Sequence, residues 1–311
     1  MITPKTKKHM STSLIRNIDV RVAGLAITTA SAVALYYGGV LPQTSAMTAL
    51  LSAALLVFGM PHGSFDLALL HNAASFRITA GSRASLIALY LTCAAAMYLL
   101  WQIAPVAALV GFLAMAVVHF AEDWDDCRSP FIAGGIAFAL ISAPSLLHGD
   151  ALKALFVLLT GQANAAILVD FLLLVAPTML GLATVGVAML WRFGQRALAI
   201  SAGCALTAMI LLPPVLGFAL FFCLVHSPMQ FSRHADVLGL TAFRQWRGIV
   251  IPLSLGGLAI AVLIYALGQG GSVDDGVFAS SFMALSVLTA PHMIVPVILQ
   301  YFQTRYSAQT A

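Results

Sequence analysis

The segment NAAILVDFLLLVAPTMLGLATVGVAMLW, residues 164–191, carries a single charged side chain, Asp170. A helix needs about 20 mostly apolar residues to cross the hydrocarbon core of a bilayer. This segment is long enough. Its one proline, Pro177, does not argue against a span, because proline is frequent in membrane helices. It therefore predicts a membrane-spanning helix.

The rest of the chain has the same character. Of its 311 residues, 61% are hydrophobic and only 8% are charged, and the mean hydropathy is +0.97. So little polar surface cannot cover a soluble globule. We expect an all-α fold, a polytopic transmembrane helix bundle with no separate soluble domain.

Apolar runs bounded by Gly, Pro or charged residues predict about ten spans. They cover residues 22–41, 46–70, 84–101, 103–121, 130–147, 164–191, 197–212, 214–229, 248–269 and 278–301. The first run is long enough to stay as a helix and not be cleaved as a signal peptide. The run at 151–160 is too short to cross, and we expect it at the membrane interface.

Basic residues predict the orientation, because Lys and Arg collect on the cytoplasmic side of membrane proteins. With a cytoplasmic N-terminus and ten spans, every Lys and Arg except Lys153 falls in a cytoplasmic segment. This gives a basic cytoplasmic tail at 1–20, a transmembrane domain at 21–302 and a cytoplasmic C-terminal tail at 303–311. The net charge of +4 then reflects topology and lipid headgroups, not nucleic acid. A multi-pass protein of the bacterial inner membrane is expected.

Four histidines, His62, His119, His226 and His292, lie at similar depth in four of the predicted spans. All four spans run in the same direction, and the depths differ by only ~6 Å at the helical rise per residue. A single buried histidine usually packs helices together, but four at one level suggest a shared site. Imidazoles from several helices can enclose a divalent metal ion such as Zn, Cu, Fe or Ni.

Helix-breaking residues flank this level. Pro61 and Pro291 precede two of the histidines, and Pro228 follows a third. Such breaks free backbone polar groups, which lipid does not tolerate unless protein or a cavity satisfies them. A built cavity is therefore expected here, although proline is common in membrane helices in any case. His234 lies eight residues after His226 and is an alternative ligand if the helix continues past Pro228.

Three carboxylates lie close to the histidines in sequence. Asp66 follows His62 by four residues, which places it near the same helix face, and Glu122 and Asp123 follow His119. They are candidates either to orient ligand imidazoles or to bind the metal directly. A solvated cytoplasmic loop is the plainer interpretation of Asp125 and Asp126.

Four motifs resemble, in order and spacing, the integral-membrane Brp/Blh family of β-carotene 15,15'-dioxygenases. They are GMPHGSFD (59–66), HFAEDW (119–124), LVHSPMQ (224–230) and APHM (290–293). The resemblance implies a multi-helix bundle that binds Fe(2+) through histidines and splits β-carotene at its central double bond into two retinals. It implies that His62, His119 and His226 are metal ligands, and His292 also matches a family motif.

One position departs from the family pattern. The family has a second histidine four residues after the histidine of LVHSPMQ, where this chain has Gln230. An amide oxygen is a weaker donor than an imidazole. The fourth ligand is then His292, with His234 or Gln230 as alternatives, or the iron has three histidines, or this member has diverged in activity.

The implied chemistry fits the composition. No side chain activates O2 unaided, so cleavage of a carbon–carbon double bond requires a redox metal. A polyene dissolves only in the bilayer and would enter sideways between helices. Aromatic residues near the histidine level are candidates to line its tunnel, although each could equally pack helices or face lipid. They are Phe58, Phe65, Phe112, Phe120, Phe221 and Phe222.

The expected partners are β-carotene or a related carotenoid, O2 and the lipid bilayer, with a functional link to a retinal-binding rhodopsin. Other classes use similar residues. A membrane di-iron hydroxylase or desaturase would need HxxxH and HxxHH boxes, and no HxxxH is present. A membrane transporter or a bis-histidine haem electron carrier remains an alternative, because intramembrane histidines and helix breaks also mark transport sites.

Overall fold

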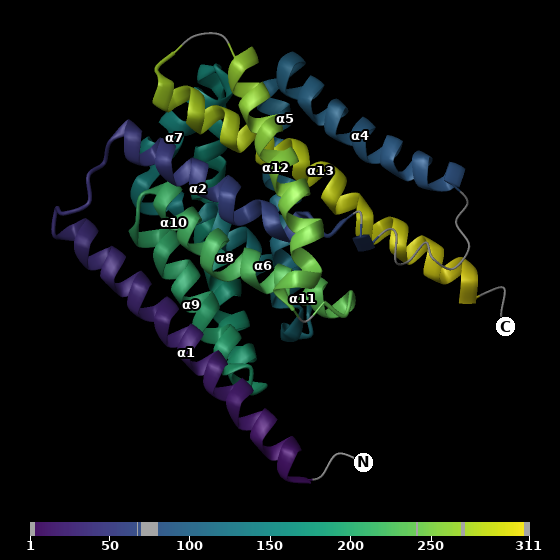
Figure 1. Cartoon of the computed structure of the whole chain (residues 1–311). Coiled ribbons are helices and arrows are strands. Elements are labelled where there is room, and N and C mark those ends of the chain that lie inside the picture. The colour runs from purple at the N-terminus through teal and green to yellow at the C-terminus, as the bar shows by residue number, and fades with distance from the viewer. Residues whose placement is uncertain (1–3, 67, 70–79, 241, 269–270, 308–311) are drawn as a thin grey trace.

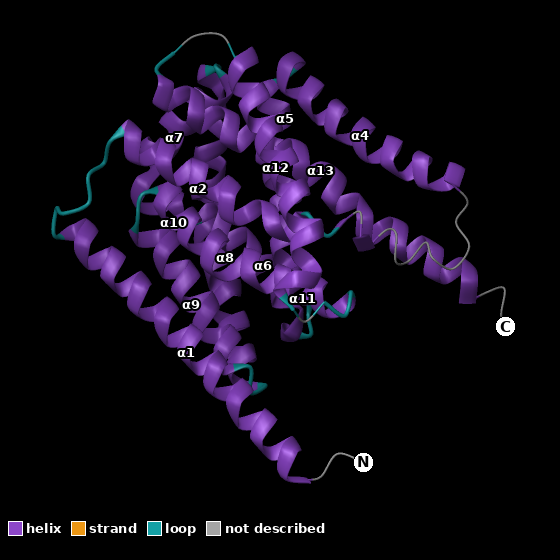
Figure 2. Ribbon diagram, in the orientation of Figure 1, coloured by secondary structure: helices purple, strands orange, loops and turns teal. Residues whose placement is uncertain are grey.

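The computed structural model describes residues 4–66, 68–69, 80–240, 242–268 and 271–307, and within these ranges the side chains of residues 4–19, 62, 80–84, 86, 243 and 295–307 are not described. In the described part every regular element is a helix, and the helices are joined by short loops (Figure 2). The predicted all-α bundle is confirmed at this level.

The helices follow one another along the described part of the chain (Figure 1). In order they are α1 (Pro4–Tyr37), α2 (Ser45–Gly63), α4 (Ala80–Ile103), α5 (Pro105–Ala121), the 3-10 helix η1 (Glu122–Cys127), α6 (Pro130–Ser142), α7 (Pro144–Thr160), the 3-10 helix η2 (Ala163–Ala166), α8 (Ile167–Arg192), α9 (Arg196–Leu211), α10 (Pro214–Phe221), the π-helix η3 (Phe222–His226), α11 (Ser227–Val237), α12 (Phe243–Leu267) and α13 (Val273–Ser307).

Six of the described helical segments are long and apolar enough to cross a membrane. They are Val20–Tyr37, Pro105–Cys127, Ala163–Arg192, Pro214–Val237, Arg244–Leu267 and Val273–Ile294. The apolar helices Ser45–Pro61, Ile87–Ile103 and Arg196–Leu211 are shorter. A multi-pass membrane protein is consistent with these lengths, while the count of ten spans stays a prediction.

A bent pair of helices replaces one predicted span. The sequence predicted a span at 130–147 and an interfacial segment at 151–160, but α6 ends at Ser142 and α7 runs from Pro144 to Thr160. The two helices are bent by 50°. Pro144 lacks the backbone N–H that would continue α6 and suits the first turn of a new helix. Residues 151–160 are therefore the second half of a broken apolar pair.

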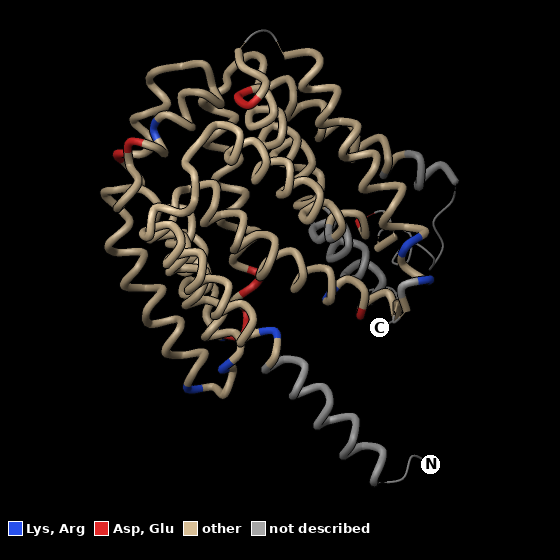
Figure 3. The backbone as a smooth tube through the Cα atoms, turned by 60° about the vertical axis from the view of Figure 1, so that its left-hand side comes forward, with Lys and Arg blue, Asp and Glu red and all other residues tan. Residues whose placement is uncertain are grey.

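The N-terminal segment is helical. Helix α1 begins at Pro4 and continues without a break into the first apolar segment. The division into a cytoplasmic tail at 1–20, a transmembrane domain at 21–302 and a C-terminal tail at 303–311 stays a prediction. Charged residues are few and lie mostly towards the helix ends, and long stretches of backbone between them carry none (Figure 3).

Small residues allow the helices to approach closely, as membrane bundles require. On α8, a Cβ added to Gly186 would lie 2.6 Å from the Cδ1 atom of Ile136 on α6. On α6, a Cβ added to Gly135 would lie 2.8 Å from the Cβ of Leu182 on α8. This tight pair supports one side of the core, while α2, α5, α13 and the α10–α11 segment carry the motif histidines.

Candidate functional site

Three of the four motif histidines meet inside the bundle. His119 on α5, His226 at the end of η3 and His292 on α13 are all buried. The ring centroid of His119 lies 4.7 Å from that of His226 and 4.8 Å from that of His292. His62 lies in α2, but its side chain is outside the described part of the chain. Three of the histidines that were predicted to lie at one level thus come together, although they are more than 60 residues apart in sequence.

His226 owes its position to a π-turn. The backbone N–H of Ser227 donates to the carbonyl oxygen of Phe222, five residues earlier. The extra residue turns the following side chains by about 100° relative to a regular α-helix. Pro228 then lies in the first turn of α11, where its missing N–H costs little. Such π-turns are frequent at functional sites.

The sequence left open whether the helix continues past Pro228, and it does, because α11 follows directly and reaches Val237. His234 therefore lies on a helix continuous with His226. Its ring centroid is 6.0 Å from that of His292 and 6.3 Å from that of Phe65. His234 is thus close to the histidine cluster, on the side of His292.

Buried carboxylates hold two of the three imidazoles. Asp123, which has no exposed surface, lies with Oδ2 2.7 Å from His226 Nδ1. Asp66, 2% exposed, lies with Oδ1 2.7 Å from His292 Nδ1. Because an ionised carboxylate only accepts, each Nδ1 carries the proton and a neutral ring keeps its lone pair on Nε2. This is the tautomer that presents Nε2 to a metal ion.

Each carboxylate is held in turn by a second donor. Gln230 Nε2 donates to Asp123 Oδ1 at 2.7 Å, and the Tyr90 hydroxyl donates to Asp66 Oδ2 at 3.2 Å. The structure therefore contains two similar hydrogen-bonded triads. In each, a side-chain donor contacts a carboxylate, and the carboxylate contacts an imidazole. Nothing in the sequence singles out Tyr90, since tyrosine is an ordinary residue in a membrane helix.

The histidine partners of the carboxylates differ from those that the spacing suggested. The Asp66 partner that the structure describes is His292, from the far end of the chain, and Asp123 pairs with His226 instead of the nearby His119. The backbone tightens into η1 at Glu122, which changes the direction in which Asp123 points. Glu122 lies near His119, with 3.5 Å between the Oε2 atom of Glu122 and the Nδ1 atom of His119.

The donor set suits a transition-metal ion, because carboxylate-supported imidazoles bind Fe, Zn, Cu and Ni. Among the side chains that the structure describes, however, no three His, Cys, Asp or Glu groups form a complete metal site. The side chain of His62, the remaining motif histidine, lies outside the described residues.

A cavity of about 290 Å³ opens beside the cluster. His119, His292, Asp66 and Tyr90 supply polar groups to its wall, and most of the remaining wall is apolar. Ile87 and Leu91 of α4 and Leu253 of α12 also line it, and these side chains are exposed on the outside of the bundle at 48%, 62% and 36%. The cavity therefore reaches the apolar surface between α4 and α12.

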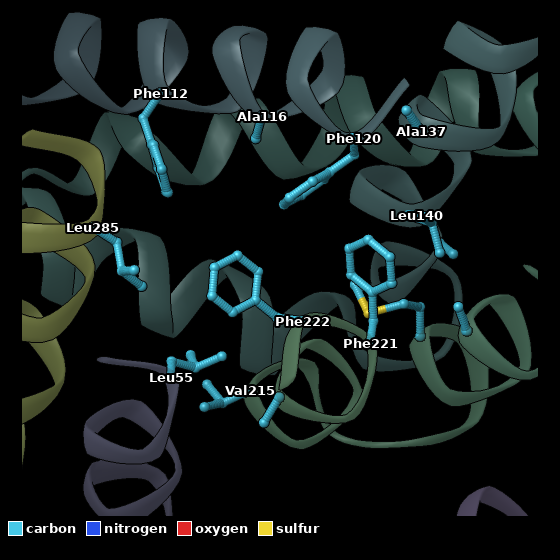
Figure 4. Close-up of a cluster of buried hydrophobic side chains, with 14 of the residues drawn as sticks. Leu55, Phe112, Ala116, Phe120, Ala137, Leu140, Val215, Phe221, Phe222 and Leu285 are labelled. Carbon is cyan, nitrogen blue, oxygen red and sulfur yellow. The ribbon is translucent and has the colours of Figure 1, made fainter. Parts of the chain in front are cut away.

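Three of the six predicted tunnel residues line this cavity: Phe112, Phe120 and Phe222. Figure 4 shows Phe112, Ala116 and Phe120 projecting from α5 towards Phe222. Gly59 on α2 leaves room for the Phe222 ring, because a Cβ there would overlap it. Phe218, Met60 and Leu285 also contribute and were not predicted.

The other three predicted tunnel residues lie elsewhere. Phe58 faces outward and is 60% exposed, because it is on the opposite side of α2 from the core. Phe65 belongs to a separate apolar cluster and packs on Phe231 at 5.0 Å between centroids. Phe221 is buried behind the wall, 4.9 Å from the ring of Phe120.

The fold and the site thus define a multi-helix membrane protein whose buried histidine–carboxylate cluster faces an apolar, laterally open cavity. The family described as beta-carotene 15,15'-dioxygenase matches residues 53–300, a range that contains all four motifs. The chain belongs to this family, which confirms the resemblance of its motifs and makes it an enzyme of the carotenoid-cleaving dioxygenase class.

A curated relative supports this assignment. The chain is 27% identical over 254 residues to a "Beta-carotene 15,15'-dioxygenase" of uncultured marine bacterium 66A03, and the alignment covers 78% of this chain and 90% of the relative. No solved structure matches the chain.

Proposed function

We propose that the protein cleaves the central 15,15' double bond of β-carotene with O2 to give two retinals, using Fe(2+) held by His62, His119, His226 and His292. The observation that carries this proposal is the cluster of three buried imidazoles, two of which, His119 and His292, line an apolar cavity. Fe(2+) would supply the activation of O2 that side chains lack.

The stoichiometry needs no further reactant. The carbon–carbon double bond breaks, and each of its carbons takes one oxygen atom of O2 to become an aldehyde. No electrons are required from outside, because the two oxygen atoms of O2 end as the two aldehyde oxygens. The retinal formed could supply a retinal-binding rhodopsin.

The chain's own residues position the reaction. Asp123 and Asp66 fix the tautomers of His226 and His292 and keep the Nε2 lone pairs available. The apolar wall formed by Phe112, Phe120 and Phe222 would bind the polyene and exclude water from the bond to be cleaved.

His292 is the preferred fourth ligand. Its ring lies against His119, and Asp66 supports it in the way that Asp123 supports His226. Gln230 uses its amide nitrogen on Asp123. His234 lies 6.0 Å from His292, at the edge of the cluster.

The substrate would enter from the bilayer. The exposed apolar side chains of Ile87, Leu91 and Leu253 border the cavity, so that a polyene dissolved in lipid can reach it without crossing water. We place the protein in the bacterial inner membrane with its N-terminus in the cytoplasm and ten crossings, as the segregation of Lys and Arg supports.

Expression in β-carotene-producing cells followed by extraction of retinoids tests the proposal. We expect retinal from the wild type and none from His119→Ala. His148→Ala is the matched control, because His148 packs on Tyr36, in α1. An intense haem absorption band, or folded iron-loaded protein that forms no retinal, would instead favour the electron carrier or the transporter.

A further inference from the structure

A second cavity lies next to the first. It measures about 90 Å³, and all of its lining side chains are apolar. Phe112, Ala116 and Phe218 line both cavities. The two spaces therefore share a wall that consists of a few side chains.

The two cavities follow one another along the same helices. On α5, Leu109 lines the second cavity and His119 lines the first, ten residues further on, or about 15 Å. On α13, Phe278 lines the second cavity and His292 lines the first. The second cavity thus continues the first away from the histidines and into the bundle.

Phe218 stands between them. Its ring stacks on Phe222, in the wall of the first cavity, with 5.4 Å between centroids. The Phe218 ring also lies 6.0 Å from that of Phe282, in the wall of the second cavity. A change in the χ1 or χ2 rotamer of this one side chain would open or close a passage between the two spaces.

The substrate of the proposed function requires space in two directions. A symmetrical polyene cut at its central bond must extend equally far on both sides of the histidine cluster. The opening at Ile87, Leu91 and Leu253 leads to the bilayer and accounts for one half. The other half needs an apolar compartment further in.

We propose that the second cavity receives the end ring of the inner half of the carotenoid and that Phe218 determines how far this half can enter. The inference rests on the proposed function. It makes Phe218 and the side chains behind it determinants of substrate length, so that chains of different length are cleaved with different efficiency.

Two variants and two substrates test this. Val215→Phe fills the second cavity, which Val215 lines without lining the first, and Phe218→Trp narrows the passage. The substrates are β-carotene and a shortened apocarotenal that keeps the central double bond but has a ring at one end only. We expect each variant to lower kcat/KM for β-carotene at least tenfold more than for the apocarotenal, because the short end still fits. Phe131→Ala, on a side chain 71% exposed, is the control and should leave the ratio unchanged.

Carotenoid binding to iron-depleted protein gives a second measure, since the visible absorption of the polyene shifts on binding without any turnover. Either variant, folded but with unchanged selectivity and unchanged binding of β-carotene, would overturn the inference. If Val215→Phe does not fold, Leu155→Phe fills the same cavity. A wild type that cleaves neither substrate would reject the proposed function itself, whereas cleavage of both with an unchanged ratio in the variants rejects only the role of the second cavity.

Discussion

At the scale of single residues, the site consists of imidazoles whose orientation depends on buried carboxylates. Asp123 has no exposed surface and uses one oxygen for His226 and the other for Gln230. A buried carboxylate is tolerated only with such partners, because burial of an unpaired charge costs several kcal/mol. The amide of Gln230 is therefore as much a part of the site as the imidazole of His226, because both hold Asp123 in place.

Replacement of Asp123 by asparagine tests its effect on His226. The amide has a similar shape but no charge, and it no longer favours the Nδ1–H tautomer. Loss of such a partner typically lowers metal affinity or activity by about 10-fold to 100-fold. We expect that loss in the iron content of purified Asp123→Asn protein. Asp126→Asn, at an exposed position in the same segment, should keep its iron; equal loss in both variants would remove the special role of Asp123.

Gln230 gives a prediction about stability. Gln230→Leu keeps the volume but removes the donor, which leaves Asp123 Oδ1 without its described partner. A buried polar group without a hydrogen-bond partner lowers the free energy of unfolding by about 1–3 kcal/mol, and by more when the group is charged. Thermal unfolding in detergent should show a lower midpoint for this variant than for Gln195→Leu, at an exposed position. Gln230→His retains a ring N–H donor and should be less destabilised than Gln230→Leu; the opposite order would contradict this role for the amide.

At the scale of helices, the structure shows which parts of the site the sequence could reveal. The histidine level was predictable because charged and ionisable groups are rare in apolar spans and stand out. The pairing of Asp66 with His292 was not, since their positions are 226 residues apart and the pair forms only when the segment after α2 packs near α13. The π-turn at Phe222–His226 was also hidden, because Pro228 is compatible with a helix break and with a new first turn.

The contact between α6 and α8 yields a prediction at this scale. Gly186→Ala would place a Cβ 2.6 Å from Ile136, so the helices must move apart, and overpacking of this kind costs about 1–3 kcal/mol. Gly181→Ala has open space and should be neutral or slightly stabilising, because alanine favours the helix by up to about 1 kcal/mol over glycine. The thermal unfolding midpoint should fall for Gly186→Ala and stay the same or rise slightly for Gly181→Ala. An equal change in both variants would contradict a contribution of close packing at Gly186 to stability.

At the scale of the whole molecule, composition alone was enough to predict a helical membrane bundle. The tunnel was only partly predictable: Phe112, Phe120 and Phe222 line the cavity, but Phe58, Phe65 and Phe221 do not. An aromatic residue close in sequence to a motif histidine lies at a similar depth in the bundle. Whether its side chain points into the cavity depends on which face of the helix packs inward, and the sequence alone does not show this. The lateral opening between α4 and α12 depends in the same way on how distant helices are arranged.

Iron removal and reconstitution test the central claim most directly. Purified wild type and His119→Ala protein would be stripped with a chelator, then supplied with Fe(2+) or Zn(2+), and retinal formation from β-carotene in O2-saturated detergent would be measured. We predict that activity is lost on stripping, returns with Fe(2+) but not with Zn(2+) in the wild type, and does not return in His119→Ala. Retinal formation by the stripped protein, or equal recovery in the His119→Ala variant, would contradict an iron centre at this histidine cluster.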